Sequence, residues 1–529
     1  MNTVTLDYFV ARALRRHARR VAIVDGARQV TYADLDRSSA AIAASLRRLG
    51  CTKGDRVALL LNNGIEFIET ELGILRAGLV KVPVNNRLSA ADVVALVSDS
   101  GAKALFVDPE FLDGIVAHRG QLGGVQAIIS REARGDVLSY ADLLKPGSDA
   151  LADADADADA DANAGAVGSD LCMIRYSGGT TGKPKGIMHS HSALVAIALS
   201  VVREYGLGAE DRFLHVAHLS HGQNFVWPAL LAVGARLVMM KKFDPVAVLQ
   251  AIERERITRL HLVPTMANAL VDAPDFASHD LSSLRNFVYA SAPMPVERIR
   301  RLREALRCRI SQTYTLSESA VISTALSPED HDVDRPGFDP GRLASCGREV
   351  LDVRVRIVDE ALNDVPKGEV GEIALMSPGN MMGYWNQPEL TALTLREGWV
   401  LSGDLARRDS EGYVYLVDRK NDKIITGGLN VYPREIEEVL HQHAAVLEAS
   451  VGGIPDERWG EAIVAFVSLK AGCVCSAEDL AEFCELRLSG YKKPKRFIFV
   501  DALPKTAIGK IARRELTAPF WSGQKRRIH

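Results

Sequence analysis

Residues 176–186, with the sequence YSGGTTGKPKG, carry the side chains best suited to bind phosphate. Glycines let backbone N–H groups turn toward an anion, hydroxyl groups donate hydrogen bonds, and lysines supply positive charge. A glycine-rich hairpin without a function would rarely combine so many hydroxyls and lysines. The residues that we expect to hold a polyphosphate are Ser177, Gly178, Gly179, Thr180, Thr181, Gly182 and Lys183, with Lys185 assisting.

This loop differs from the P-loop pattern G-x-x-x-x-G-K-[ST]. Ser177 stands where the first glycine of that pattern belongs, and Pro184 follows Lys183, which leaves no hydroxyl for magnesium. The sequence also gives no sign that a strand runs directly into a helix here. We therefore predict a phosphate-binding loop of another kind.

His215, His218 and His221 have the spacing H-x-x-H-x-x-H, which suits three imidazoles on one helical face. The surrounding residues instead indicate a strand followed by a loop, with no acidic partner nearby, and a metal site is therefore disfavoured. Cys473 and Cys475 form a C-x-C pair without a second pair at zinc-site spacing, and we interpret them as structural.

The elements that must position these residues follow a regular order. We expect helices at 32–49, with Thr31 as a possible cap, at 65–76 and at 90–97. Short apolar segments at 56–61, 79–84 and 104–107 are typical of buried strands. Helices that alternate with such strands predict βαβ units and a largely parallel sheet.

The composition excludes several classes of protein. The 529 residues favour two to four domains at ~150 residues each, and 47% hydrophobic with 25% charged residues is typical of a globular protein. A net charge of −3 disfavours a protein that coats nucleic acid. We expect no membrane span, since no apolar run approaches the ~20 residues required, and the N-terminus lacks the apolar core of a secretory signal. Seven scattered cysteines fit a reducing, cytoplasmic environment.

Two segments mark the organisation of the chain. Residues 149–164 are almost pure Asp and Ala. In a helix, the Asp side chains would place repelling charges all around the helix axis and leave no apolar face to bury. We therefore predict a flexible acidic surface loop. A boundary is expected near Arg419, because residues 422–529 contain helix and strand signals of their own, at 433–441, 464–469 and 477–486. We thus predict an N-terminal domain over 1–419, a hinge at Lys420 and Asn421, and a C-terminal domain over 422–529.

The segment SGGTTGKPKG resembles the phosphate loop of the adenylate-forming superfamily, which includes acyl-CoA synthetases, adenylation domains of peptide synthetases, and luciferases. Further motifs follow in that superfamily's order: QTYTLSE at 312–318, SGDL at 402–405, GGLNVYPREIE at 427–437 and PKTAIGKIARREL at 504–516. Any one of them could arise by chance, but the ordered set extends over nearly the whole chain and is highly specific.

The resemblance implies an α/β fold, in which helices flank the mixed and parallel sheets of a large N-terminal domain and a small mobile α+β domain follows. It implies that a carboxylate attacks the α-phosphate of ATP to give an acyl-adenylate, and that a thiol then displaces AMP. ATP, Mg²⁺ and CoA are the implied cofactors. Two alternatives remain, namely a ligase that loads a carrier protein's phosphopantetheine and a luciferase-like oxygenase.

The resemblance also implies roles around the nucleotide. Lys510 would bridge carboxylate and phosphate, and Glu318 would bind Mg²⁺, for which a hard oxygen ligand is suited. The remaining implied nucleotide contacts are Ala290, Ser291, Ala292, Tyr314, Ser317, Asp404 and Arg419. The sequence departs from the family twice: Ser317 replaces threonine and keeps the hydroxyl, whereas Thr315 replaces glycine and puts the tightness of that turn in doubt.

For the acid, the resemblance assigns His221 to the entrance of the acyl pocket. Phe225 and Trp227 follow and would either line that pocket or pack in the core. Gly222, Gln223 and Asn224 stand near the place where amino-acid-activating relatives carry an aspartate, so an apolar acid, aliphatic or aromatic, is expected.

For the acceptor, the small domain resembles acyl-CoA synthetases. Trp459 and Tyr491 would flank the pantetheine tunnel, Lys493 and Lys495 would meet the phosphates of CoA, and Gly428 belongs to the stretch used in thioester formation. The alternative is that these lysines are ordinary surface charge, and a carrier protein would also be attracted to a basic patch.

Overall fold

The computed structural model describes residues 4–145, 165–177, 184–220, 222–291, 294, 296–505 and 511–522. The acidic segment 149–164, the loop residues 178–183 and Lys510 lie outside this description, as do His221 and Ala292. The chain forms two compact units, Met1–Val355 with Leu375–Val400 and Arg356–Ala374 with Leu401–His529. The predicted domain boundary at Arg419 remains a prediction.

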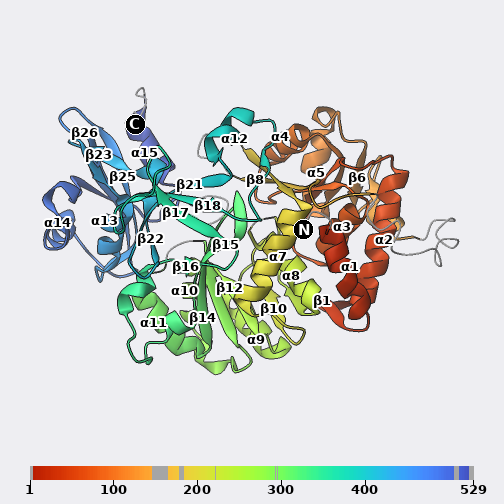
Figure 1. The fold of residues 1–529 in the computed structure, drawn as a ribbon, viewed down its shortest axis with the longest axis horizontal. Coiled ribbons are helices and arrows are strands. Elements are labelled where there is room, and N and C mark those ends of the chain that lie inside the picture. Colours follow the sequence, from red (N-terminus) through yellow and green to blue (C-terminus); the bar gives the residue numbers. More distant parts are fainter. Residues whose placement is uncertain are drawn as a thin grey trace. The chain divides into compact units, whose positions relative to one another are not determined.

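The first unit is built from two sheets and the helices that pack on them (Figure 1). Its α-helices are α1 (Leu6–Arg16), α2 (Tyr32–Arg48), α3 (Ile65–Arg76), α4 (Ala90–Ser100), α5 (Pro109–Ala117), α6 (Tyr140–Leu143), α7 (His191–Tyr205), α8 (Val226–Val233), α9 (Pro245–Glu255), α10 (Pro264–Val271), α11 (Val296–Leu306) and α12 (Pro388–Thr394).

The nine strands of the larger sheet lie in the order β16-β15-β14-β13-β12-β10-β11-β1-β2. Their bounds are β1 (Val21–Asp25), β2 (Arg28–Thr31), β10 (Arg212–His215), β11 (Arg236–Met239), β12 (Arg259–Leu262), β13 (Asn286–Ala290), β14 (Arg309–Leu316), β15 (Ser319–Leu326) and β16 (Arg348–Glu349). Neighbours from β14 through β1 are parallel, whereas β2, β15 and β16 pair antiparallel.

The eight strands of the second sheet lie in the order β19-β9-β8-β4-β3-β5-β6-β7. Their bounds are β3 (Arg56–Leu60), β4 (Val80–Pro83), β5 (Ala102–Val107), β6 (Ala127–Ser130), β7 (Leu138–Ser139), β8 (Leu171–Ser177), β9 (Lys185–Ser190) and β19 (Gly383–Tyr384). From β8 to β7 the neighbours are parallel, so the prediction of an α/β fold with largely parallel sheets is confirmed.

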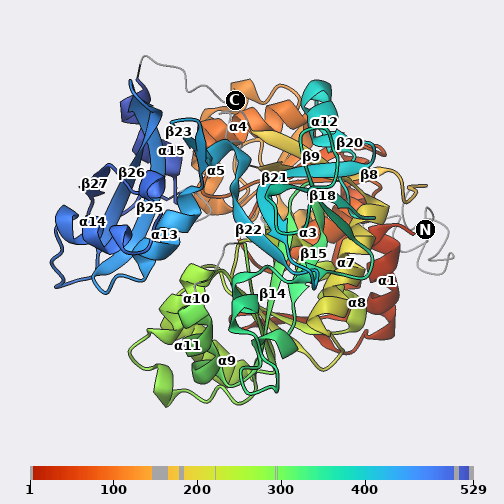
Figure 2. The same ribbon diagram turned by 60° about the vertical axis from the view of Figure 1, so that its left-hand side comes forward.

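Two helices connect these sheets by packing against both. Helix α3 contacts β4 of one sheet and β1 of the other, and α7 contacts β8, β9 and β15. Helices α1 and α8 pack against α7 and one another in the same helical layer (Figures 1 and 2). This shared layer buries apolar side chains of both sheets, which is the usual way in which α/β proteins cover a parallel sheet.

Local signals explain where these helices begin. Thr31 accepts a hydrogen bond from the backbone N–H of Asp34, whose carboxylate accepts one from the backbone of Thr31, so Thr31 is the cap that the sequence predicts. Helix α3 matches the predicted range 65–76 residue for residue. Helix α4 extends beyond the predicted end at 97 because Gly101, with φ of 62°, closes it.

The remaining strands form two smaller sheets. One has the order β17-β18-β21-β20, with β22 beside β21; its strands are β17 (Arg354–Val358), β18 (Gly371–Met376), β20 (Leu395–Arg396), β21 (Trp399–Arg408) and β22 (Val414–Arg419). The other has the order β24-β23-β26-β25, with β27 beside β26; its strands are β23 (Ile424–Thr426), β24 (Leu429–Val431), β25 (Val446–Asp456), β26 (Gly460–Leu469) and β27 (Arg496–Phe499).

The helices of the second unit pack around its own core. They are α13 (Pro433–His441), α14 (Ala477–Glu485) and α15 (Arg513–Thr517). Ile436 and Leu440 of α13 join Val451, Ile463 and Leu480 in one buried cluster. Among the described residues, no helix has the length and apolar character that crossing a membrane would require.

The first unit should lose stability as the pH falls from about 7 to about 5. Burial lowers the pKa of six histidines, to about 3 for His189 and His215 and to about 4 for His191, His218, His261 and His331. Because the unfolded chain binds protons near pH 6.5 and the folded one does not, each histidine costs about 1 kcal/mol per pH unit below 6.5.

Buried carboxyls oppose this trend, since burial raises the pKa of Asp7 to about 6. The histidines outnumber them, and we expect a net loss of several kcal/mol by pH 5. Urea denaturation from pH 7.5 to 5 measures it, and His261→Asn should reduce the slope. A free energy of unfolding that stayed constant over this range would show that these imidazoles are not buried in neutral form.

Candidate active site

The predicted phosphate loop connects two antiparallel strands. Strands β8 and β9 pair so that Ser177 lies opposite Lys185 and Tyr176 opposite Gly186. A Cβ atom on Gly186 would lie 2.9 Å from Cγ2 of Ile174 and 3.1 Å from Cβ of Trp385, so only glycine fits there. The strand therefore leads into a second strand and not into a helix, in agreement with the exclusion of a P-loop.

The turn between β14 and β15 carries Ser317 and Glu318 and is held from three directions. Arg175 of β8 donates from Nη2 to Oγ of Ser317, and Nε2 of His189 in β9 lies 3.0 Å from the carbonyl oxygen of Ser317. The hydroxyl of Tyr384 donates to Oε1 of Glu318 at 2.8 Å. The structure thus places the Ser317–Glu318 turn directly beside the strands that carry the phosphate loop.

Arg175 and His189 were not found by sequence reasoning. Arg175 is 8% exposed and His189 is fully buried, and both pack on Phe225, with Cζ of Arg175 4.8 Å and the imidazole centroid 5.8 Å from its ring centroid. Burial lowers the pKa of Arg175 to about 10, an effect that attraction to Glu318 opposes. The only signal in the sequence was a charged residue that continues an apolar strand.

Glu318 fits a magnesium ion that arrives with phosphates. Its Oε1 is engaged by Tyr384, and Lys185 Nζ lies 5.7 Å from the centroid of the Tyr384 ring. Among the described residues, no group of three or more His, Cys, Asp or Glu side chains could hold a metal ion. Mg²⁺ commonly binds through one or two carboxylates together with phosphates and water, which a single glutamate satisfies.

The predicted adenine contacts lie at the ends of two neighbouring strands. Ala290 ends β13 opposite Thr313 of β14, and Tyr314 follows, partly exposed. Ser291 adopts φ of 74°, which is uncommon for a residue other than glycine and is typical of functional sites. Thr315 is exposed and is not among the residues with positive φ, so its side chain does not strain the turn.

Asp404, which the resemblance assigns to the ribose hydroxyls, and Arg419, which it assigns to the phosphate or the ribose, face each other in the second unit. Asp404 of β21 lies opposite Arg419 of β22, and Nε of Arg419 is 3.1 Å from Oδ1 of Asp404. Asp404 is buried whereas Arg419 is exposed, which gives a fixed carboxylate with a cation beside it.

The segment that carries the predicted acyl pocket is anchored by a buried ion pair. Lys81 of β4 lies 3.0 Å from Glu71 of α3, and neither side chain is more than 1% exposed. Asn224 accepts from Lys81 and donates to Glu71, each at 2.8 Å. Trp227 is fully buried and donates its indole N–H to Glu71 at 2.8 Å. This position agrees with the second of the two predicted roles, packing in the core. Phe225 is 8% exposed.

Two members of the histidine triplet, His215 and His218, lie within the described residues. Both ring nitrogens of His215 are buried without a hydrogen-bond partner, and Nδ1 of His218 lies 2.6 Å from the hydroxyl of Ser220. His221 lies outside the described residues.

The residues assigned to CoA lie in the second unit, where Gly427 approaches Trp459. The N–H of Gly427 donates to the carbonyl oxygen of Trp459 at 2.8 Å, and a Cβ on Gly427 would lie 2.7 Å from the indole. Nζ of Lys495 lies 5.8 Å from the indole centroid, so Trp459 and Lys495 are adjacent. Lys493 pairs with Glu485, and Tyr491 is 44% exposed. Gly428 follows Gly427 with φ of 79°.

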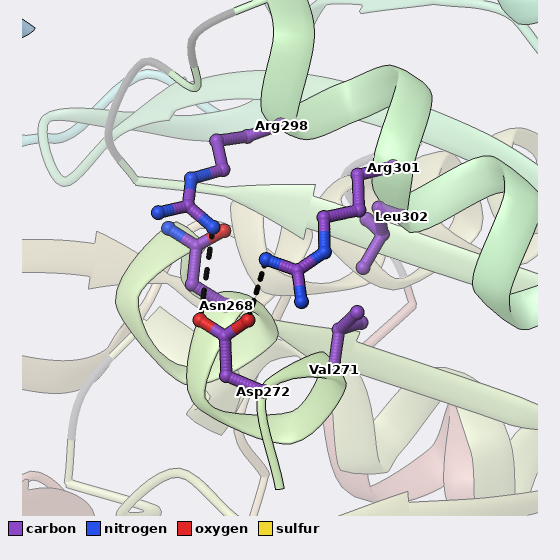
Figure 3. A pocket seen from close by; sticks show the side chains of 6 residues that line it. All are labelled: Asn268, Val271, Asp272, Arg298, Arg301 and Leu302. Atoms are coloured by element: carbon purple, nitrogen blue, oxygen red, sulfur yellow. Dashed lines mark ion pairs between the residues drawn. The ribbon is translucent and has the colours of Figure 1, made fainter. Parts of the chain in front are cut away.

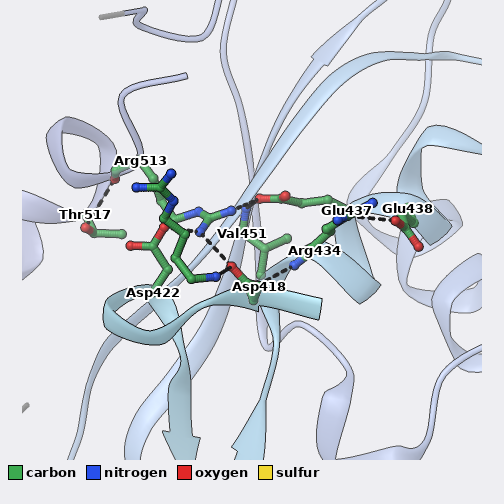
Figure 4. A network of polar contacts seen from close by, with 9 residues as sticks. Asp418, Asp422, Arg434, Glu437, Glu438, Val451, Arg513 and Thr517 are labelled. Atoms are coloured by element: carbon green, nitrogen blue, oxygen red, sulfur yellow. Dashed lines mark hydrogen bonds and ion pairs between the residues drawn. The ribbon is translucent and has the colours of Figure 1, made fainter. Parts of the chain in front are cut away.

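The predicted hinge, Lys420 and Asn421, lies in a 3₁₀ turn (Lys420–Asp422) next to a network of charges (Figure 4). Arg513 lies 2.8 Å from Asp422, 2.8 Å from Glu437 and 3.7 Å from Asp418. Burial raises the pKa of Asp418 to about 6, although Arg513 opposes this. Nζ of Lys420 lies 3.0 Å from Glu372.

Comparison with known proteins decides the family. Residues 10–385 match the family model of the AMP-binding enzymes, and residues 435–510 match that of their C-terminal domain. The chain belongs to the AMP-binding enzyme family. Its relatives place this AMP-binding enzyme in the acyl-CoA synthetase branch, as an AMP-forming acid–thiol ligase.

Three curated relatives of this AMP-binding enzyme cover almost the whole chain. A medium/long-chain-fatty-acid–CoA ligase of Mycobacterium tuberculosis is 36% identical over 98% of this chain and 91% of its own. A feruloyl-CoA synthase of Amycolatopsis is 35% identical over 98% and 100%. A fatty acid–[acyl-carrier-protein] ligase of Streptomyces coeruleorubidus is 33% identical over 96% and 95%.

Solved structures agree with this assignment. The anthranilate CoA ligase AuaEII, in complex with anthranoyl-AMP, superimposes with a TM-score of 0.87 and 29% identity over 98% of both chains. ATP-bound MatB from Rhodopseudomonas palustris gives a TM-score of 0.87 and 28% identity over 99% of this chain and 100% of its own.

A shallow pocket between α10 and α11 is lined by Asn268, Val271, Asp272, Arg298, Arg301 and Leu302 (Figure 3). Arg298 and Arg301 both point to Asp272, at 3.6 Å and 2.6 Å. No residue assigned to the nucleotide or the acid lines it, and its carboxylate is already paired.

Replacing Lys81 should destabilise the enzyme far more than replacing an exposed lysine. Lys81→Met leaves the carboxylate of Glu71 buried without its cation, which should lower the free energy of unfolding by ~3–5 kcal/mol. Lys53→Met, which removes an exposed lysine 2.9 Å from Asp170, should cost about 1 kcal/mol or less. Urea denaturation measures both. Equal, small losses would show that Glu71 does not depend on Lys81 for its charge.

Proposed function

We propose that this enzyme activates an apolar carboxylic acid, aliphatic or aromatic, as an acyl-adenylate and transfers the acyl group to CoA. The observation that carries the proposal is the Ser317–Glu318 turn, which three side chains hold beside the two ends of the phosphate loop. A carboxylate and a phosphate repel each other, so a site that joins them must supply fixed donors and positive charge.

In the first half-reaction, residues 177–183 and Lys185 hold the triphosphate, and Lys510 bridges the carboxylate and the α-phosphate. Asp404 accepts from the ribose hydroxyls, while Arg419 provides positive charge beside it. Tyr314, Ala290, Ser291 and Ala292 surround the adenine. A magnesium ion at Glu318 would neutralise phosphate charge as the acid attacks.

An apolar acid is favoured by the residues around Phe225. The amide of Asn224 is engaged at both ends by Lys81 and Glu71, so it is not presented to a ligand. An amino-acid substrate would need a carboxylate beside its ammonium group, and the segment 222–224 supplies none. The relatives named for fatty acids and ferulate favour the same class of acid.

CoA is favoured as acceptor by the exposed indole of Trp459 with the cation of Lys495 beside it, in the same unit as Tyr491, Lys493 and Gly428. A carrier protein is the second candidate, because one relative at 33% identity is named as a carrier-protein ligase. A luciferase-like oxygenase has less support. The scattered, unpaired cysteines favour a cytoplasmic location.

The test is ATP–pyrophosphate exchange across a panel of aliphatic, aromatic and amino acids, followed by thioester detection with either CoA or a phosphopantetheinylated carrier. Exchange that depends on an apolar acid, with thioester formed on CoA, would support the proposal. Exchange restricted to amino acids would contradict the assignment of the acid, and thioester on the carrier alone would contradict that of the acceptor.

Glu318→Gln should raise the Mg²⁺ concentration required for half-maximal exchange by about tenfold or more and lower the rate. A neutral amide is a poorer ligand for a hard dication than a carboxylate. Titration of exchange activity with Mg²⁺ at saturating ATP measures this, with Glu369→Gln, an exposed carboxylate before β18, as the control. An unchanged titration would place the metal elsewhere.

Asn421→Pro should separate the two half-reactions. Proline fixes φ near −65° and disfavours helical geometry at Lys420, so it should restrict rotation of the backbone within the turn 420–422. We expect adenylation to persist, and thioester formation from preformed adenylate to fall by ~10²-fold or more. If both rates fell by the same factor in a folded protein, the hinge would not lie at this position.

A further inference from the structure

Arg175 is a buried cation without a contacting anion. Its Nη2 donates to the hydroxyl of Ser317, its guanidinium lies over the ring of Phe225, and Nη1 is buried without a hydrogen-bond partner. No carboxylate of the described residues lies within ion-pair distance of it. Burying an unpaired charge is costly, and such a group is retained where its charge or its spare donor is used.

His189 fixes the other side of Ser317. Its Nε2 lies 3.0 Å from the Ser317 carbonyl oxygen, which can only accept, so Nε2 carries the proton and donates. Its Nδ1 is buried without a hydrogen-bond partner among the described residues. Two adjacent strands therefore hold one serine, β8 at its hydroxyl and β9 at its carbonyl.

This arrangement determines what the Ser317 hydroxyl can do. Because its oxygen accepts from a guanidinium, which can only donate, the hydroxyl proton is left for another acceptor. Glu318 is the next residue, and its carboxylate lies close enough to Arg175 for the two opposite charges to attract each other. A fixed donor and a fixed cation at one turn favour an anion, whereas the cation opposes a lone metal ion at Glu318.

We propose that Arg175 is a positioning residue that keeps the Ser317 hydroxyl as a donor to the polyphosphate and makes the turn bind metal together with nucleotide in preference to the metal ion alone. This inference rests on the proposed function, in which Glu318 binds the metal and the turn faces the phosphates. Arg175 would thus have two opposite effects: it strengthens binding of the polyphosphate anion and weakens binding of a metal ion without nucleotide.

The test measures binding in the absence of turnover. Metal-free ATP, in the presence of EDTA, is titrated by equilibrium dialysis, and Mn²⁺ alone is titrated by electron paramagnetic resonance. Arg175→Met should bind ATP about tenfold or more weakly and bind Mn²⁺ about tenfold more tightly than the unaltered enzyme. Arg175→Lys, which keeps the charge but not the planar fork, should stay within about threefold of the unaltered enzyme for Mn²⁺.

Two controls separate charge from folding. Arg254→Met removes the same charge from an exposed position on α9 and should change neither affinity. His189→Leu keeps the cation of Arg175 and an apolar side chain beside Phe225 but removes the donor to the Ser317 carbonyl, so it should weaken ATP binding without tightening Mn²⁺ binding. If Arg175→Met does not fold, Arg175→Lys and His189→Leu still test the two parts separately.

Unchanged ATP affinity, or equal weakening of ATP and Mn²⁺ binding, in Arg175→Met would overturn the inference and leave Arg175 as a packing residue. The proposed function would fail differently: the unaltered enzyme would then bind no ATP or would exchange no pyrophosphate with any acid. An enzyme that exchanges pyrophosphate, and whose Arg175→Met variant binds both ligands normally, would contradict only the role given to Arg175.

Discussion

The pairing of β8 with β9 is the constraint on which the site depends. Antiparallel register places Ser177 opposite Lys185, so both ends of the phosphate loop are fixed by backbone hydrogen bonds. Arg175 of β8 lies opposite Ile187 of β9, and His189 is two residues from Ile187, so the side chains of Arg175 and His189 lie on the same face of the sheet. From this face both reach Ser317. A shift of β9 by one residue against β8 would turn His189 to the opposite face and remove its bond to Ser317.

The core around this hairpin also contains a group of buried polar side chains, centred on Glu71, that bind one another. Glu71 accepts from Lys81 of β4, and from Asn224 and Trp227, which belong to a 3₁₀ turn and to helix α8 directly after it, at least 143 residues further along the chain. Buried ion pairs add little net stability over apolar packing, but they are strongly directional. A matched network of this kind fixes the position of the segment that carries Phe225, as apolar contacts alone would not.

Local signals predicted most of the framework, and long-range pairing decided the rest. Helices α3 and α13 match their predicted ranges because apolar periodicity and end residues agree. Strand β26 begins at Gly460, four residues before its predicted start, because β25 pairs with it along its full length. Arg175 and His189 could not be assigned from the sequence, because their partner Ser317 lies 142 and 128 residues away. The motifs predict which residues face the nucleotide, but they do not predict which residues hold those side chains in place.

The second unit shows how a single cation can link two motifs. Arg513 lies at the start of α15, three residues after Lys510, and it contacts Asp418 before the predicted hinge and Asp422 after it (Figure 4). Glu437 of α13 accepts from the same guanidinium and from the backbone N–H of Val451. Because one rigid group reaches both sides of residues 420–421, any rotation there must lengthen at least one of these contacts. If the chain rotates at the predicted hinge, this network would contribute to the barrier to that rotation, and Arg513 would couple the terminal motif to the hinge.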